Sequence, residues 1–339
     1  MSDVFIFGAG ASMEYRGACG PLFCDKDFFQ VVEKMWTTGN RANFRNYDGG
    51  RLDWPRLKQF VEKRFNRPVE SIGLEEAFVE VDGMEQDLED LFCRCIELAL
   101  FWRMRGTSPQ NLYTHCEFLR RVLRPGGTLI TFNYDPILEY ALTHIAHCGT
   151  ISWNPVTGYG LPFKKEFSGG HLRELTTKQQ SNVSLFKLHG SMNWLFFYGE
   201  SPSQPRYLLR FTNDSLLRGV GFKIMVEETS STVLRPLFVP PKSAKDYESY
   251  GLTELWNKAE QALENPTSLT VIGYRFPKTD AGALELIRKA EHLAESTRVT
   301  YVTDNKEAAA TFSEYFSKAY VDTRGFAAYV TQPGQDRQN

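Results

Sequence analysis

Short runs of β-branched and aromatic residues recur along this chain of 339 residues, and helical patterns separate them. Strands that alternate with helices are typical of a mainly parallel sheet with helices on both faces. We expect strands at residues 4–7, 128–132, 185–188, 269–272 and 299–303. We expect helices at residues 86–103, 112–123, 137–145, 252–263, 284–293 and 308–316. The pattern therefore predicts an α/β fold with a Rossmann-like, doubly wound, mainly parallel sheet.

The first two expected strands are separated by about 120 residues, although a crossover connection needs roughly a few tens of residues. We therefore expect an inserted, mostly helical subdomain at about residues 20–110. The sheet core would come from residues 1–19 and 111–330, so that residues 1–330 form a single domain. Two irregular excursions are expected at about residues 148–183 and 196–245, followed by a frayed polar tail at residues 331–339.

The composition argues against several classes of protein. A net charge of −2, from 39 basic and 41 acidic residues, gives no overall field that would recruit nucleic acid or an anionic membrane. The longest apolar stretches contain charged residues and are shorter than the ~20 apolar residues of a membrane helix. The N-terminus has no signal-peptide pattern, and the six cysteines include no CxxC pair. We expect a globular protein of the reducing cytoplasm that neither spans a membrane nor binds nucleic acid directly.

A glycine turn follows the first expected strand. It consists of Gly8, Ala9, Gly10, Ala11 and Ser12. Glycines let a backbone approach a phosphate closely, and the amides at the start of a following helix favour an anion. The motif is not a full GxGxxG, because position 13 is a methionine, and a glycine turn after a strand is often only a turn. Nucleotide binding is therefore one of two interpretations of this segment.

Polar residues also follow the second expected strand, at Thr131, Asn133 and Asp135. In open α/β sheets, ligands bind at the carboxyl ends of the strands. Asp135 precedes Pro136, so it is a good N-cap for the next helix whatever else it does. Asn133 lies between two aromatic residues just past a buried strand, and its amide needs hydrogen-bond partners there.

The third expected strand ends at His189 and Gly190. A lone histidine is usually structural. At this position, however, the adjacent glycine would give a ligand close access, and an imidazole can serve as a base near neutral pH.

The last two expected strands end in similar residues. Gly273 and Tyr274 follow the fourth strand, with an expected helix cap at Asp280. Asp304 and Asn305 follow the fifth strand, where such residues either hydrogen-bond a ribose or cap the next helix.

Taken in this order, the five motifs resemble those of the sirtuin family, and more closely the sirtuin-like domains of bacterial NAD-consuming defence proteins. The glycine turn is similar to the family's GAGxS cofactor loop. Thr131, Asn133 and Asp135 match its TxNxD strand end, and residues 188–190 match the LHG that carries the catalytic histidine.

The later motifs extend the resemblance across nearly the whole chain. Gly273 and Tyr274 stand where sirtuins have a GTS-type turn, and Asp304 and Asn305 stand where the family contacts the adenosine ribose. The resemblance ends at the zinc ribbon. Deacylating sirtuins carry paired CxxC motifs, and this chain has none, so we expect no zinc ribbon and no bound metal.

The resemblance implies that NAD binds across the carboxyl ends of the strands. Its pyrophosphate would lie over the glycine turn, and its adenosine ribose near Asp304 and Asn305. Asn133 is assigned to the nicotinamide ribose and the attacking water, and His189 to the activation of a ribose hydroxyl or of that water. Asp135 would hold the nicotinamide amide. Without a peptide groove, water is the default acceptor, so the expected activity is that of an NAD glycohydrolase.

Two other functions stay open. A protein deacylase or ADP-ribosyltransferase would need a substrate groove, and a non-catalytic sensor of NAD or ADP-ribose would not need both Asn133 and His189. The favoured function is that of the NAD-depleting effector of a bacterial anti-phage defence system.

A toxic NADase must be restrained in a healthy cell. We therefore expect a homo-oligomer and a separately encoded partner, such as a sensor, an ATPase or a nucleotide-signal protein. Phe28, Phe29 and Trp36 of the inserted segment are expected to offer apolar surface for oligomerisation. The alternative is that this segment packs over the NAD crevice as a lid.

Overall fold

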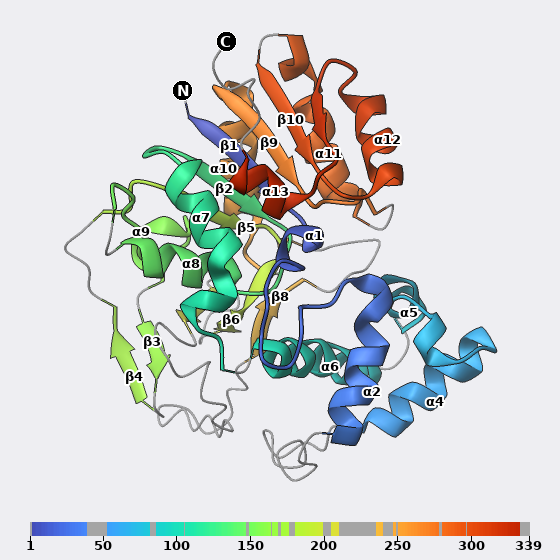
Figure 1. Cartoon of the computed structure of the whole chain (residues 1–339). Coiled ribbons are helices and arrows are strands. Elements are labelled where there is room, and N and C mark those ends of the chain that lie inside the picture. Colours follow the sequence, from blue (N-terminus) through green and yellow to red (C-terminus); the bar gives the residue numbers. More distant parts are fainter. Residues whose placement is uncertain are drawn as a thin grey trace.

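The centre of the protein is a six-stranded sheet of order β11-β10-β9-β1-β2-β5, in which all neighbouring strands are parallel (Figure 1). Its strands are β1 (Asp3–Phe7), β2 (Thr128–Thr131), β5 (Ser184–Lys187), β9 (Ser268–Ile272), β10 (Arg298–Val302) and β11 (Tyr320–Asp322). The computed structural model describes residues 2–38, 53–81, 86–104, 106–146, 149–163, 165–168, 171–175, 180–198, 205–209, 235–239, 247–248, 250–277, 280–295 and 297–332. The predicted Rossmann-like α/β fold with a mainly parallel sheet is confirmed.

Helices cover both faces of this sheet (Figure 1). One face carries α7 (Tyr113–Arg121), α8 (Ile137–Ala146) and α13 (Phe326–Thr331), and the other carries α10 (Thr253–Glu264), α11 (Ala281–Lys289) and α12 (Lys306–Tyr315). On the first face, the Phe118 ring packs edge-on against Phe5 and Phe7, at centroid distances of 5.1 and 5.3 Å. On the second, Tyr301 stacks on Phe312 at 4.4 Å. Aromatic side chains therefore fasten helices to both sides of the central strands.

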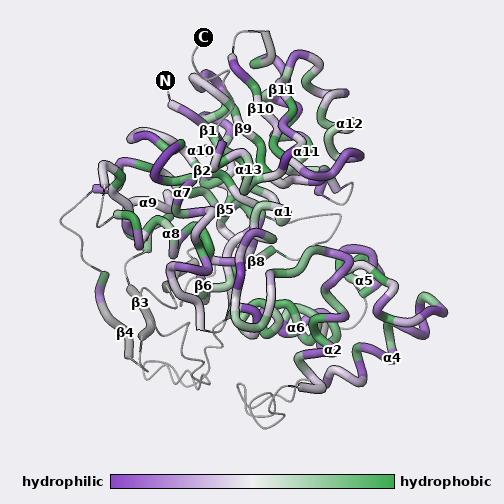
Figure 2. The backbone as a smooth tube through the Cα atoms, viewed as in Figure 1, coloured by the Kyte–Doolittle hydropathy of each residue, from purple (hydrophilic) through white to green (hydrophobic). Residues whose placement is uncertain are grey.

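The strands themselves are hydrophobic, as Figure 2 shows for β9. Val4, Ile6 and Val271 are each 0% exposed, which is the usual burial of a parallel sheet covered on both faces. Within the described ranges, no helix is long and apolar enough to cross a membrane. Helix α13 ends at Thr331, and residues 333–339 of the expected tail lie outside the described residues.

Between β1 and β2 the chain forms a group of helices beside the sheet (Figure 1). It contains α2 (Phe28–Thr38), α4 (Trp54–Phe65), α5 (Leu74–Val81) and α6 (Gln86–Met104), together with the 3₁₀ turns η1 (Asp25–Asp27), η2 (Val69–Ser71) and η3 (Pro109–Leu112). The Phe92 ring of α6 packs against Phe28 and Phe29, at 5.7 and 5.8 Å. Both phenylalanines are fully buried, and Trp36 is partly buried against the same core. The expectation that these residues offer apolar surface is therefore wrong, because the helices bury them among themselves.

A second sheet, of order β4-β3-β7-β6-β8, adjoins the first. It contains β3 (Lys165–Ser168), β4 (His171–Glu174), β6 (Gly190–Tyr198), β7 (Pro205–Leu209) and β8 (Arg235–Phe238), and the short helix α9 (Pro155–Gly158) precedes it. The prediction that residues 148–183 and 196–245 are irregular is wrong where these strands lie. Two of the pairings, β3 with β7 and β6 with β8, join segments that are distant in the chain, and a local pattern does not show such partners. Strand β6 begins directly after His189, where the pattern predicts only a turn.

Candidate active site

The order of the central strands creates a switch point between β1 and β9. Strands β2 and β5 follow β1 on one side, whereas β10 and β11 follow β9 on the other. Such a switch point leaves a crevice outside the carboxyl ends of the strands, which is the usual ligand site of open α/β sheets. In this protein the turns that follow β1 and β9 meet there.

Glycines allow these two turns to pack against each other. A Cβ on Gly8 would lie 2.5 Å from Tyr274 Cα, and a Cβ on Gly10 would lie 2.8 Å from Gly273 O. Gly273 has φ +62°, and a Cβ there would overlap Ala11 N. The amides of Gly8 and Gly10 donate to carbonyl oxygens at the end of β9, each at 2.9 Å, and the Ala11 amide donates to Gly8 O at 3.0 Å. The glycines thus have a packing role, and these three amides bond within the protein rather than to a phosphate.

A cavity of about 870 Å³ opens over the carboxyl ends of the central strands, within the size range of ligand pockets. Most of the predicted site residues line it: Gly8, Ala9, Gly10, Ser12, Asn133, Asp135, His189, Gly273, Tyr274 and Asn305. The others do not, because Ala11 and Thr131 are each 1% exposed behind the wall and Asp304 faces solvent. The inserted helical segment contributes Leu22, Phe23, Ile96 and Leu100 to the lining. This is the arrangement that the lid interpretation predicts.

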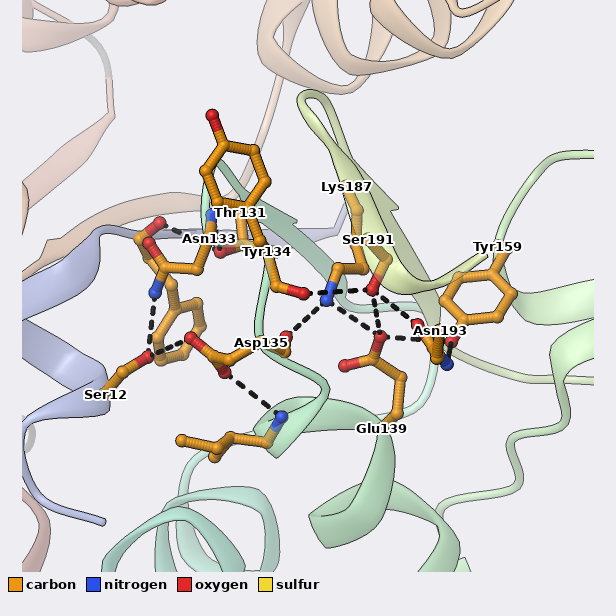
Figure 3. Close-up of polar contacts among 12 residues, drawn as sticks. Ser12, Thr131, Asn133, Tyr134, Asp135, Glu139, Tyr159, Lys187, Ser191 and Asn193 are labelled. Carbon is orange, nitrogen blue, oxygen red and sulfur yellow. Dashed lines mark hydrogen bonds and ion pairs between the residues drawn. The ribbon is translucent and has the colours of Figure 1, made fainter. Parts of the chain in front are cut away.

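Asn133 follows β2, and its side chain points toward the glycine turn (Figure 3). Its Nδ2 donates to Gly8 O and to Ser12 Oγ, both at 2.9 Å. Its backbone amide donates to Thr131 Oγ1 at 3.1 Å, which explains the threonine behind the wall. Both Nδ2 hydrogens are therefore used, and no hydrogen bond from the described part of the chain reaches Oδ1. Asn133 is left with its carbonyl oxygen, an acceptor, as the group it can present to a ligand.

Asp135 is buried, and both of its carboxylate oxygens bond to the protein. Oδ1 accepts the backbone N–H of Ile137, the first residue of α8, at 3.1 Å, so the side chain bonds to the start of the helix, although the helix begins one residue after Pro136 and not at it as predicted. Oδ2 accepts the Ser12 hydroxyl at 2.8 Å (Figure 3). Asp135 thus positions Ser12, and through it Asn133, rather than offering an unoccupied oxygen to nicotinamide.

A buried ion pair lies behind this wall (Figure 3). Lys187 is 0% exposed, and its Nζ lies 2.9 Å from Glu139 Oε1. The same Nζ donates to the backbone oxygen of Asp135, and Tyr159 OH donates to Glu139 Oε1 at 3.1 Å. Burial raises the pKa of Glu139, and Lys187 opposes that shift. The sequence analysis did not predict the pair of Lys187 and Glu139. A lysine inside an apolar strand is nevertheless a signal, because a buried lysine usually needs a buried acidic partner.

His189 lies between the two sheets, in the link from β5 to β6, and is 4% exposed. Its Nε2 lies 3.3 Å from Asp280 Oδ1. Asp280 also accepts the Ala283 amide at 3.4 Å, which confirms the helix cap expected there. Gly190 has φ +77° and does not line the cavity, so it turns the chain between sheets rather than giving a ligand access to the histidine.

Aromatic rings surround the imidazole of His189. The ring centroids of Phe132, Trp256, Tyr247 and Tyr134 lie 5.2, 6.2, 6.3 and 6.4 Å from it. Burial raises the pKa of Tyr134 well above its usual 10 and also raises the pKa of Tyr247, so both hydroxyls stay neutral. Among the described residues, aromatic rings therefore surround the histidine, and the Asp280 carboxylate lies close to it.

The far end of the cavity lies beyond β10. Asn305 accepts the Ala308 amide at 2.9 Å and caps α12, as one of its two interpretations predicts. This end is lined by Arg275, Phe276, Arg288 and Tyr315, and also by Glu307 and Glu314 of α12. The Arg288 guanidinium lies 5.3 Å from the centre of the Tyr315 ring. Such groups suit a phosphate and a planar base.

The chain matches no family model, and no curated protein is significantly similar to it. In the part of the chain that the structure describes, no group of three or more His, Cys, Asp or Glu side chains could hold a metal ion.

Proposed function

We propose that this protein is an NAD glycohydrolase, which cleaves the bond between nicotinamide and ribose in NAD and releases nicotinamide and ADP-ribose. The proposal is carried by the positions of Asn133 and His189 at the ends of neighbouring strands β2 and β5, in one large cavity. An amide oxygen and an imidazole that line one cavity from neighbouring strands suit a reaction that builds positive charge on a ribose and uses water as the nucleophile.

The length of the cavity supports a dinucleotide as the substrate. Its lining residues follow every strand from β10 to β5, which are four steps apart in the sheet. At about 4.8 Å per step, the site spans about 19 Å, comparable to an extended dinucleotide. In this orientation the adenosine lies at the end lined by Arg288 and Tyr315, and the nicotinamide ribose lies near His189.

In the proposed mechanism, the bond between C1′ and the nicotinamide nitrogen breaks and its electron pair leaves with nicotinamide. Positive charge develops on the ribose, where Asn133 Oδ1 can stabilise it and orient the attacking water. The water oxygen bonds to C1′, and His189 accepts the proton that the water loses. The products are nicotinamide, ADP-ribose and one proton, which the imidazolium later returns to solvent.

The hydrogen bonds behind the wall support this assignment of roles. Asp135 fixes the Ser12 hydroxyl, and Ser12 and Gly8 O together fix the Asn133 amide. A catalytic group held in one orientation before the substrate arrives needs no rearrangement during the reaction.

The alternative functions predict different substrates for the same cavity. A deacylase or an ADP-ribosyltransferase would transfer ADP-ribose to an acyl-lysine or a protein side chain, so product analysis distinguishes it from a hydrolase. We further propose that the enzyme acts in the cytoplasm as the effector of an anti-phage defence system, as a homo-oligomer and under the control of a separately encoded partner.

Substitution of the two reacting residues tests the proposal. We expect His189→Ala and Asn133→Ala each to lower the rate of nicotinamide release by about 10²–10⁴, the usual contribution of a positioned catalytic group. His292→Ala removes an exposed histidine of the 3₁₀ turn η5 (Glu291–Glu295), and we expect it to retain the wild-type rate.

The assay follows nicotinamide and ADP-ribose by chromatography, with the protein alone and with the proteins encoded beside it. Calorimetric titration with ADP-ribose checks that each variant still binds. Wild-type turnover by either active-site variant would contradict the mechanism, and transfer of ADP-ribose to protein in place of water would favour the transferase.

A further inference from the structure

The Asp280 carboxylate, which lies beside His189, comes from an element that the proposed mechanism does not use. Asp280 precedes α11, on the turn after β9, and its side chain is 6% exposed. Its Oδ1 lies 3.3 Å from His189 Nε2, so the histidine can donate its Nε2 proton to that oxygen. Two side chains from different sheet crossovers thus meet inside the cavity wall.

Other groups hold the Asp280 carboxylate in place. Its Oδ1 accepts the Ala283 amide at 3.4 Å, and its Oδ2 accepts the Tyr274 hydroxyl at 3.4 Å. Tyr274 belongs to the same turn that packs against Gly8, and the Tyr301 hydroxyl donates to the Tyr274 backbone oxygen at 2.5 Å. The carboxylate is therefore tied to the turn that packs closely against Gly8 and Gly10.

From this geometry we infer that Asp280 is a positioning residue for His189. By accepting the Nε2 proton, it selects one tautomer of the imidazole and places the lone pair on Nδ1, the nitrogen that acts as the base. When Nδ1 takes a proton from water or a ribose hydroxyl, the carboxylate stabilises the imidazolium that forms. Asp280 itself gains no proton and does not touch the substrate.

The surroundings strengthen this interaction. The two side chains are 5% and 6% exposed, so neither water nor salt screens the charges effectively. The rings of Phe132, Trp256 and Tyr247 cover the histidine on other sides. In a site of this kind, an oriented carboxylate contributes far more than it would at the surface.

A purely structural role for Asp280 as a helix cap makes a different prediction, and the residue type allows the two to be separated. Serine and asparagine cap helices about as well as aspartate. Asp280→Asn keeps the cap and a neutral acceptor for Nε2 but removes the charge. Asp280→Ser keeps the cap but is too short to reach the histidine.

We therefore expect kcat for nicotinamide release to fall in the order wild type, Asp280→Asn, Asp280→Ser, with a loss of at least about tenfold in the serine variant, part of the ~10²–10⁴ that a general base supplies. KM should change little, because Asp280 acts through His189. The matched control is Asp53→Ser, since Asp53 caps α4 by accepting the Arg56 amide at 3.3 Å. We expect wild-type kcat from it.

This inference rests on the proposed function for its kinetic consequence, so a second measurement tests it without turnover. Nitrogen-15 NMR of the imidazole rings reports which nitrogen carries the proton, and His189→Gln identifies the signal among the six histidines. We expect the Nε2–H tautomer in the wild type and a mixture in Asp280→Ser.

The two measurements separate the possible failures. If the wild-type protein shows the Nε2–H tautomer but releases no nicotinamide, the interaction of Asp280 with His189 is supported and the proposed NAD glycohydrolase activity is refuted. An Asp280→Ser variant that retains the wild-type tautomer, or the wild-type kcat in an active enzyme, would overturn the positioning role.

Discussion

Replacement of Lys187 by methionine would leave the Glu139 carboxyl group buried without its cation. The side chains of the pair are 0% and 6% exposed, so solvent does not take the place of the lost partner. Loss of one member of a buried ion pair typically costs about 3–5 kcal/mol, against roughly 5–15 kcal/mol for the whole free energy of unfolding of a natural domain. We therefore expect Lys187→Met to lower the free energy of unfolding by about 3–5 kcal/mol.

The loss should depend on pH, with a sign that follows from the carboxyl group. Burial already raises the pKa of Glu139, and removal of Lys187 raises it further. A group with a higher pKa in the folded state than in the unfolded state binds more protons when folded. The folded variant is therefore less destabilised at mildly acidic pH than above pH 7.

Urea unfolding at acidic and neutral pH, followed by tryptophan fluorescence, measures both effects. The matched control is Lys289→Met, which breaks an exposed pair of 2.8 Å to Glu260, with exposed fractions of 52% and 42%. Exposed pairs contribute at most about 1 kcal/mol. Lys187→Met combined with Glu139→Gln removes both charges of the pair and should recover most of the loss. A Lys187→Met variant as stable as Lys289→Met would refute the reasoning.

Three further predictions concern the rest of the molecule. Gly8→Ala would place a Cβ 2.5 Å from Tyr274 Cα and should lower the free energy of unfolding by about 1–3 kcal/mol, whereas Gly149→Ala, whose Cβ meets no atom closer than 3.9 Å, should be neutral in the same urea titration. Burial lowers the pKa of His115 to about 4, so protonation of this histidine favours the unfolded chain below pH 6.5. The free energy of unfolding should therefore fall by up to about 3 kcal/mol between pH 6.5 and 4 from this residue alone. An equally steep fall in His115→Phe would contradict that assignment. Light scattering should return a mass above that of a single chain, and a fully active monomer would rule out control by oligomerisation.

The expected strands of the central sheet lie within about one residue of the observed ones, because a parallel sheet buried on both faces is encoded by local apolar runs. The turns that end them were predictable for the same reason. The second sheet was not, because β3 pairs with β7 and β6 pairs with β8 only across long stretches of chain. The residues around Gly190 carry no local pattern that predicts the start of a second sheet there.

The site shows the same division between local and distant information. Asn133 and His189 were singled out from their own surroundings, and both line the cavity. Position 8 must be glycine because Tyr274, far along the chain, packs against it. The carboxylate beside His189 likewise comes from a distant residue, Asp280. Local patterns thus identified the groups that could react but not the groups that hold them.

The position of β1 in the sheet also affects the order in which the protein can fold. This strand precedes the other strands of the sheet in the chain and lies between two that come much later, with hydrogen bonds to residues 124 and 265 positions further along the chain. Pairing over such separations carries a large loop-closure entropy and makes folding slow. Until β9 has been synthesised, β1 can therefore pair with β2 alone, and the crevice where NAD is proposed to bind can form only after that.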